Sequence, residues 1–166
     1  MLNEVLLGLF LSATGLIVAG LLAWIGFVSF ANINLSPFAF MNTLTTLGLL
    51  LLYTSSFEVY RARDLLIFLA VSFFFHAGRL STLLESEDKR LRIFFLSAGH
   101  TKSEYALNYL FKRAIRKNIA SLLLCWGLLT TSFVLREMNI PRNQSFWLGL
   151  FLLCLGVTSF LLDRKY

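Results

Sequence analysis

The chain alternates between long apolar stretches and short polar connections. Five apolar runs cover about residues 5–31, 38–54, 64–78, 119–135 and 146–162. Because about 20 apolar residues suffice for a helix to cross a membrane, we expect these runs to be spans. The pattern leaves open whether one of the first two runs is re-entrant. We therefore predict an all-α polytopic membrane protein, with residues 1–166 as a single membrane domain of four to five transmembrane helices.

Composition supports the same class. Hydrophobic residues make up 57% of the chain and charged residues only 14%, whereas soluble chains carry about 25% charged residues. This balance excludes a disordered tail and a disulfide-rich secreted domain, and it argues against a water-soluble enzyme. We expect an integral protein of a bacterial cytoplasmic membrane, surrounded by membrane lipid.

The basic residues are concentrated in one segment. The net charge is +6, and nine of the 15 Lys and Arg residues lie between Arg79 and Lys117. Because Lys and Arg are retained on the cytoplasmic side of a membrane, we attribute this charge to topology and expect no nucleic acid partner. The segment 79–118 and the C-terminus are predicted to be cytoplasmic. Five spans would then place the N-terminus outside, and a re-entrant segment would place it inside.

Small residues recur at steps of three or four along the first run. Such a stripe lets helix backbones approach closely in lipid. It predicts a helix-packing face, directed either to a second subunit or to other helices of this chain. Its members are Gly8, Ser12, Gly15, Ala19, Ala23 and Gly26.

Local signals predict several helix ends. Ser36 and Pro37 suit a helix start, with Ser36 as the N-cap. Ser55 and Glu58 fit a capping box that would start the third helix. We expect the polar residues of the second run to hydrogen-bond between helices, although a pore lined by them is an alternative. They are Asn42, Thr43, Thr45 and Thr46.

A cytoplasmic elbow is predicted over residues 79–118. The helical period of the apolar residues continues past the third run, so we expect one helix from about Asp64 to Ser97, about 50 Å long, that projects as a stalk. Gly99 suits the left-handed residue that ends a helix. Thr101 and Glu104 form a capping box that starts the next helix, which leads into a basic amphipathic segment.

Candidate catalytic residues are sparse, and we expect no enzyme, no metal and no cofactor. No Asp, Glu, Lys or Arg lies at the centre of an apolar run. We interpret His76 as an interfacial side chain and His100 as part of the elbow turn. Cys125 and Cys154 lie in apolar runs and are expected to be buried packing residues.

The elbow resembles a known family. Residues 89–102 read Lys-Arg-Leu-Arg-Ile-Phe-Phe-Leu-Ser-Ala-Gly-His-Thr-Lys. They are similar to the corner of the FtsX/MacB-type ABC transporter permease domain, which reads basic–basic–x–Glu–apolar and then Leu-Gly-x-Ser/Thr-Lys/Arg. Gly99, Thr101 and Lys102 match, whereas Leu91 stands where the family usually has Glu. The resemblance covers about residues 64–162, and a tiny loop replaces the large extracytoplasmic domain that usually follows the first span.

The resemblance implies a transmembrane subunit that couples a separate cytoplasmic ATPase to the membrane. The chain has no G-x-x-x-x-G-K-[ST] motif, so the ATPase would be another subunit. A second transmembrane subunit, in a homo- or heterodimer, is implied as well. The alternative is a non-transporting scaffold or assembly subunit of a larger membrane complex. The residues expected to contact the ATPase are Leu96, Ser97, Ala98, Gly99, His100, Thr101, Lys102 and Glu104.

Overall fold

The chain is an all-α polytopic membrane protein. The computed structural model describes residues 2–28, 35–56, 62–85, 89–137 and 141–163, and these ranges contain helices and no strand. Four helices are long and apolar enough to cross a membrane, over Leu2–Val28, Asp64–Thr82, Lys112–Leu135 and Arg142–Leu162. The elements are α1 (Leu2–Val28), η1 (Ser36–Phe40), α2 (Thr43–Ser56), α3 (Ala62–Glu85), α4 (Lys89–Ser97), α5 (Lys102–Tyr105), η2 (Ala106–Phe111), α6 (Lys112–Glu137) and α7 (Arg142–Asp163).

The second apolar run forms two short helices rather than one long helix. The 3₁₀ helix η1 and the α-helix α2 have 5 and 14 residues. Asn42 lies at the break and caps α2, because its side-chain oxygen accepts from the Thr45 amide at 2.9 Å. Its side-chain nitrogen donates to the Gly156 carbonyl of α7 at 2.7 Å.

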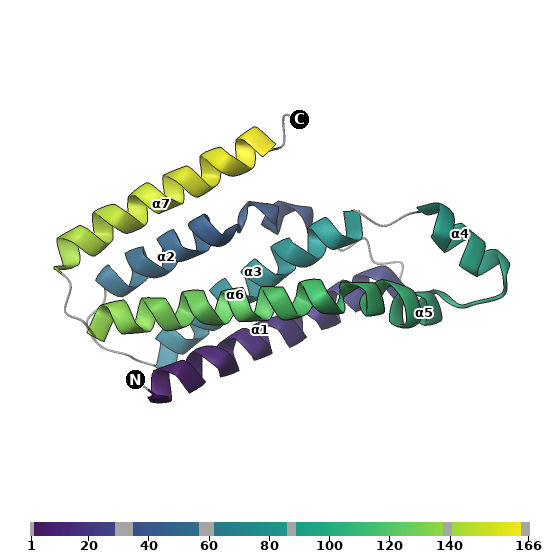
Figure 1. The fold of residues 1–166 in the computed structure, drawn as a ribbon, viewed down its shortest axis with the longest axis horizontal. Coiled ribbons are helices and arrows are strands. Elements are labelled where there is room, and N and C mark those ends of the chain that lie inside the picture. Colours follow the sequence, from purple (N-terminus) through teal and green to yellow (C-terminus); the bar gives the residue numbers. More distant parts are fainter. Residues whose placement is uncertain (1, 29–34, 57–61, 86–88, 138–140, 164–166) are drawn as a thin grey trace.

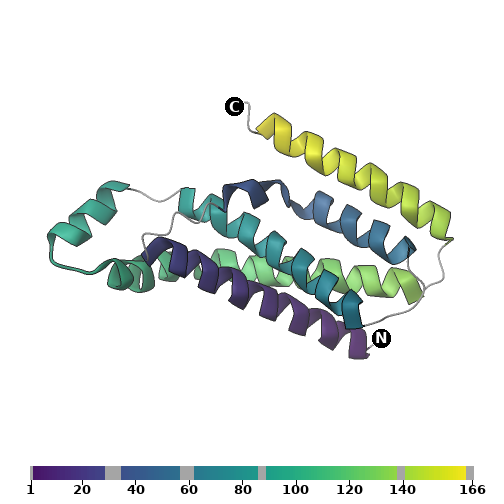
Figure 2. The ribbon, with the colours of Figure 1, turned by 180° about the vertical axis from the view of Figure 1, so that it is seen from behind.

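The helices run back and forth along one axis. In Figure 1, α1 starts at one end of the bundle and the elbow lies at the other, and α7 runs toward the elbow but ends well before it. Seen from behind, α1, α3 and α6 lie together and α2 lies between them and α7 (Figure 2). Two apolar clusters fill the interior, one around Phe68, Phe75 and Leu129 and one around Ala19 and Ala77.

The outermost helix, α7, packs mainly on α2 along a seam of glycines. A Cβ added at Gly48 would lie 2.6 Å from the Leu153 amide nitrogen and 2.7 Å from the Gly149 carbonyl oxygen. The two backbones are therefore in direct contact, as is usual for small residues between membrane helices. The opposite side of α7 exposes large apolar side chains such as Trp147 and Phe151, as expected of a lipid-facing helix.

The predicted single stalk helix is wrong. The structure has α3 ending at Glu85 and α4 beginning at Lys89, and α4 runs in a different direction from α3 (Figure 1). The physical reason is the amphipathic character of α4. Its Phe95 ring packs against the rings of Tyr105 and Tyr109, and a straight stalk would have left this face in water.

Two predicted helix starts also differ from the structure. The N-cap of η1 is Leu35, without a side-chain cap bond, and Pro37 lies in its first turn. Ser55 belongs to the last turn of α2, where its hydroxyl donates to the Leu52 carbonyl at 2.9 Å. It therefore does not cap the third helix, and Glu58 lies outside the described residues.

Replacing Gly48 by Ala should destabilise the protein. The added methyl group meets backbone atoms of α7, which cannot rotate away as a side chain would, so we expect a loss of about 1–3 kcal/mol. Gly127→Ala is the matched control, because a Cβ at Gly127 meets nothing within 4 Å. Unfolding in mixed micelles measures both variants, and equal stability of the two would contradict the close α2–α7 contact.

Candidate functional site

The turn between α4 and α5 is closed by a Schellman motif. Gly99 has φ = +90°, in the left-handed region that favours glycine. The Gly99 amide donates to the Leu96 carbonyl at 3.1 Å, and the His100 amide donates to the Phe95 carbonyl at 3.2 Å. These are the two hydrogen bonds that define the motif. The ring centroids of Phe95 and His100 lie 5.7 Å apart and supply its usual accompanying contact.

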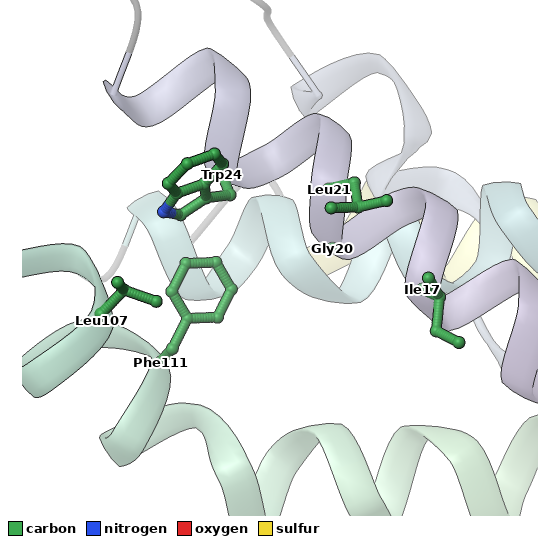
Figure 3. Close-up of a pocket in the computed structure, with 6 residues that line it drawn as sticks. All are labelled: Ile17, Gly20, Leu21, Trp24, Leu107 and Phe111. Atoms are coloured by element: carbon green, nitrogen blue, oxygen red, sulfur yellow. The ribbon is translucent and has the colours of Figure 1, made fainter. Parts of the chain in front are cut away.

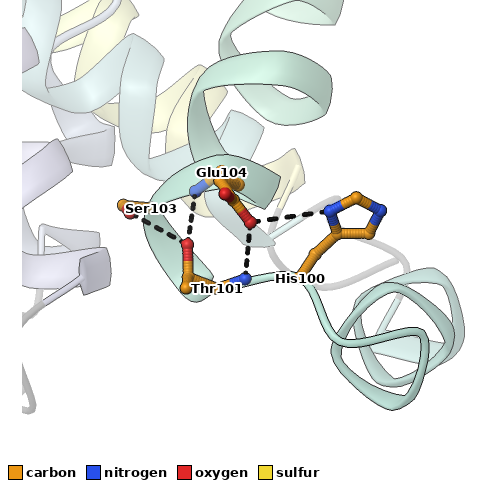
Figure 4. A network of polar contacts seen from close by, with 4 residues as sticks. All are labelled: His100, Thr101, Ser103 and Glu104. Atoms are coloured by element: carbon orange, nitrogen blue, oxygen red, sulfur yellow. Dashed lines mark hydrogen bonds and ion pairs between the residues drawn. The ribbon is translucent and has the colours of Figure 1, made fainter.

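A capping box starts α5 immediately afterwards, as the sequence predicts. The Glu104 amide donates to Thr101 Oγ1 at 3.2 Å, and the Thr101 amide donates to Glu104 Oε2 at 2.9 Å. His100 Nδ1 lies 3.5 Å from the same carboxylate oxygen (Figure 4). The hydrogen bond from the Thr101 amide is the main reason that the pKa of Glu104 is lowered from its ordinary value. The turn is therefore ordered by local bonds on both sides.

Aromatic rings tie the elbow to α1. The Phe27 and Tyr105 rings stack with centroids 6.1 Å apart, and Tyr105 stacks on Tyr109 at 5.4 Å. The guanidinium of Arg92 in α4 lies over the Phe27 ring at 5.9 Å from its centroid. Tyr105 is only 1% exposed. The end of α1 thus serves as the common anchor of α4, α5 and η2.

The outer side of the elbow is exposed to its surroundings. All eight predicted contact residues lie in and around this one turn. Among them Leu96 and Lys102 are half-buried and the other six are exposed; Ser103, which lies between two of them, is half-buried as well. On α4, Arg90, Ile93, Phe94 and Ser97 form an exposed stripe at helical spacing, and Ile93 and Phe94 are 64% and 66% exposed. Such an exposed apolar pair beside a rigid turn is suited to contact another protein.

The small residues of α1 point into the bundle. Gly8, Ser12, Gly15, Ala19 and Ala23 are buried and Gly26 is half-buried. A Cβ at Gly15 would collide with the Ser72 side chain of α3, and one at Gly8 would lie 3.0 Å from Thr130 Oγ1 of α6. This face therefore contacts other helices of the same chain.

A polar cluster lies where α1, α3 and α6 meet. His76 is 0% exposed, so its side chain lies inside the helix bundle. Its Nδ1 lies 2.8 Å from Ser121 Oγ, and its Nε2 lies 3.5 Å from Ser12 Oγ. Ser12 Oγ donates to the Leu122 carbonyl at 3.0 Å, so it can only accept from the ring. We therefore assign the proton to Nε2, with Ser121 donating to Nδ1.

A second chain of bonds runs beside the first. Cys125 Sγ donates to Ser72 Oγ at 3.4 Å, and Ser72 Oγ donates to the Leu11 carbonyl of α1 at 3.1 Å. The sequence carries a signal for this cluster, since Ser72 and His76, like Ser121 and Cys125, are four residues apart on one helix face. Cys154 differs from its prediction: it is exposed on α7, the helix that faces lipid.

The cluster joins α1, α3 and α6 through hydrogen bonds between their side chains and main chains. Its members are hydroxyls, a thiol and one imidazole, with no carboxylate among the partners described above. Within the described residues, no three His, Cys, Asp or Glu side chains gather as metal ligands. The elbow turn is therefore the stronger candidate for a functional site. Comparisons of the chain with protein families, curated proteins and solved structures give no match.

The capping box should weaken in acid. The lowered pKa of Glu104 means that its carboxylate stabilises the turn at neutral pH, and that this contribution is lost as the pH falls through the lowered pKa. Hydrogen exchange of peptides covering residues 98–106, normalised to the intrinsic rate at each pH, should show falling protection. Glu104→Gln keeps a cap without a titrating group, so its protection should not change with pH. An equal fall in both proteins would contradict the role of Glu104.

Removing the Ser121 hydroxyl should loosen the bundle. Ser121→Ala leaves His76 Nδ1 without its donor, and we expect a loss of about 1 kcal/mol, as for other hydrogen bonds between membrane helices. Thr158→Ala is the control, because Thr158 donates only to carbonyls of its own exposed helix turn. Titration with a denaturing detergent measures the stability of both variants. An equal loss of stability in the two would argue against a special role for the cluster.

Proposed function

We propose that this chain is the transmembrane subunit of an ABC-type complex, in which the elbow couples a separate cytoplasmic ATPase to the membrane. A second transmembrane subunit, identical or different, completes the complex. The observation that carries the proposal is the turn at Gly99. It is exposed, it is ordered by a Schellman motif and a capping box, and it lies at the end of the bundle toward which α7 runs (Figure 1).

The charge distribution supports a cytoplasmic elbow. Exposed cationic side chains at this end include Arg79, Arg90, Lys112, Arg116 and Lys117, and basic residues are retained on the cytoplasmic side. The N-terminal end of α1 lies at the opposite end of the bundle (Figure 1). An elbow that faces the cytoplasm is accessible to an ATPase, and a C-terminus on the same side follows.

The mechanism we propose is mechanical. The ATPase grips residues 96–104 and displaces them as it opens and closes around ATP. Because Tyr105 stacks on Phe27 and Arg92 lies over the same ring, the displacement passes to α1. The α1 helix contacts α3 and α6 through its buried small residues, so movement of its end shifts the three helices together.

The alternative is a scaffold or assembly subunit without transport. The same exposed turn would then bind a partner that does not hydrolyse ATP. The two functions differ in one measurable respect: only the coupling subunit should change the rate of ATP hydrolysis of the partner that it retains.

Co-purification in mild detergent tests the proposal. The tagged protein should retain an ATPase, and Gly99→Ala should reduce that retention about tenfold, since a Cβ at positive φ costs about 1–2 kcal/mol and distorts the turn. Gly127→Ala should retain the ATPase fully, because its Cβ meets nothing and its backbone is helical.

A second variant separates docking from folding. Phe94→Ser alters only the exposed stripe of α4 and should also reduce retention, with an unchanged melting temperature in detergent. If no ATPase co-purifies with the wild-type protein, the proposed coupling function is wrong. A retained partner that does not hydrolyse ATP would favour the scaffold or assembly function.

A further inference from the structure

A groove lies between the second half of α1 and η2, the short helix that leads into α6. Its volume is about 320 Å³, within the size range of small-molecule sites. Six residues line it: Ile17, Gly20, Leu21, Trp24, Leu107 and Phe111 (Figure 3). The lining is apolar apart from one indole nitrogen. A ligand of this groove must therefore be largely hydrocarbon.

The groove lies near the level at which hydrocarbon gives way to head groups. Ser12 of α1 bonds to Leu122 of α6, and Ile17 to Trp24 lie one to three turns further toward the elbow. At 27 residues, α1 is about 40 Å long and exceeds the ~30 Å core. The first two turns of α6 follow directly after Phe111 and expose Lys112, Arg113, Arg116 and Lys117.

The Trp24 side chain leaves a hydrogen-bond donor without an acceptor. Its indole nitrogen is covered and has no hydrogen-bond partner among the residues that the structure describes. In Figure 3 this nitrogen faces the end of the groove where Leu107 lies. A buried donor normally has a partner, and Trp side chains at a membrane interface combine an apolar ring with a polar group. An oxygen-rich ligand at that end would provide the acceptor.

We infer that the groove binds an anionic phospholipid. One acyl chain lies along Ile17, Leu21 and Phe111, and the phosphate lies toward the Leu107 end of the groove, near Lys112 and Arg113, the first two residues of α6, which are exposed. Basic pockets between transmembrane helices on the cytoplasmic side are the usual sites for anionic head groups. The apolar lining would contact the acyl chain, and the cationic residues would contact the negative charge of the head group. The Trp24 indole N–H would donate to an ester or phosphate oxygen. This inference does not depend on the proposed ATPase partner.

Gly20 allows a direct test. A Cβ at Gly20 meets nothing within 4 Å, and Gly20 lines the groove, so the side chain of Gly20→Leu should occupy the groove. Gly127→Leu adds the same side chain to α6 at another position with open space. Native mass spectrometry of the detergent-solubilised protein, titrated with phosphatidylglycerol or phosphatidylcholine, reports the bound lipid. The wild-type and Gly127→Leu proteins should retain phosphatidylglycerol, and Gly20→Leu should retain about tenfold less, since each buried methylene contributes about fourfold in affinity.

Two further variants test the head-group contacts. Replacing Lys112 and Arg113 together by Gln should abolish the preference for phosphatidylglycerol over phosphatidylcholine. Trp24→Phe keeps an aromatic ring but removes the indole N–H, and it should weaken retention of both lipids. Equal lipid retention by Gly20→Leu and Gly127→Leu would overturn the proposal. Loss of a dimer from Gly20→Leu, with lipid retention unchanged, would also overturn it and make the groove an interface between two copies.

Discussion

The structure depends on how closely α3 and α6 can approach α1. Apolar side chains give no hydrophobic driving force between helices in lipid, because lipid tails are equally apolar. The small residues Gly8, Ser12 and Gly15 let the neighbouring helices come near enough for side-chain hydroxyls to reach main-chain carbonyls. Ser72 donates to the Leu11 carbonyl at 3.1 Å, and Ser12 donates to the Leu122 carbonyl at 3.0 Å. Packing and hydrogen bonding at this contact therefore support each other.

The same helix connects the membrane interior with the elbow. Ser12 in the first half of α1 lies beside His76 of α3. The other end of α1 carries Phe27, which contacts Tyr105 and Arg92. A partner that moved the turn at Gly99 would therefore act on α1 as well as on α3. This differs from a straight stalk, in which α3 alone would carry the movement. The folded-back α4 makes the elbow a compact unit instead of a lever.

The sequence was most informative where a short-range rule decides the structure. Apolar run length identifies the long helices, the need for positive φ places Gly99 at a helix end, and the Thr101–Glu104 spacing gives the capping box. Contacts between distant segments could not be predicted in this way. A helical period does not tell whether α4 continues α3 or folds back onto Tyr105.

Burial within the bundle was the other quantity that the sequence could not supply. His76 lies near the end of an apolar run, and only the helix arrangement brings Ser12 and Ser121 to its ring. Cys125 and Cys154 sit in similar apolar contexts, yet one faces the cluster and the other faces outward from α7. At the break between η1 and α2, Asn42 bonds to Gly156, a residue more than one hundred positions away.

The central claim is that the elbow turn is the docking site of a cytoplasmic ATPase. Photo-crosslinking in living cells tests it most directly, with a photoreactive amino acid at the exposed position Ala98 and, as a control, at the exposed position Leu155 of α7. The account predicts a covalent adduct between position 98 and an ATP-binding protein, and none from position 155. An adduct at position 98 with a protein that does not bind ATP, or no protein adduct there, would contradict it.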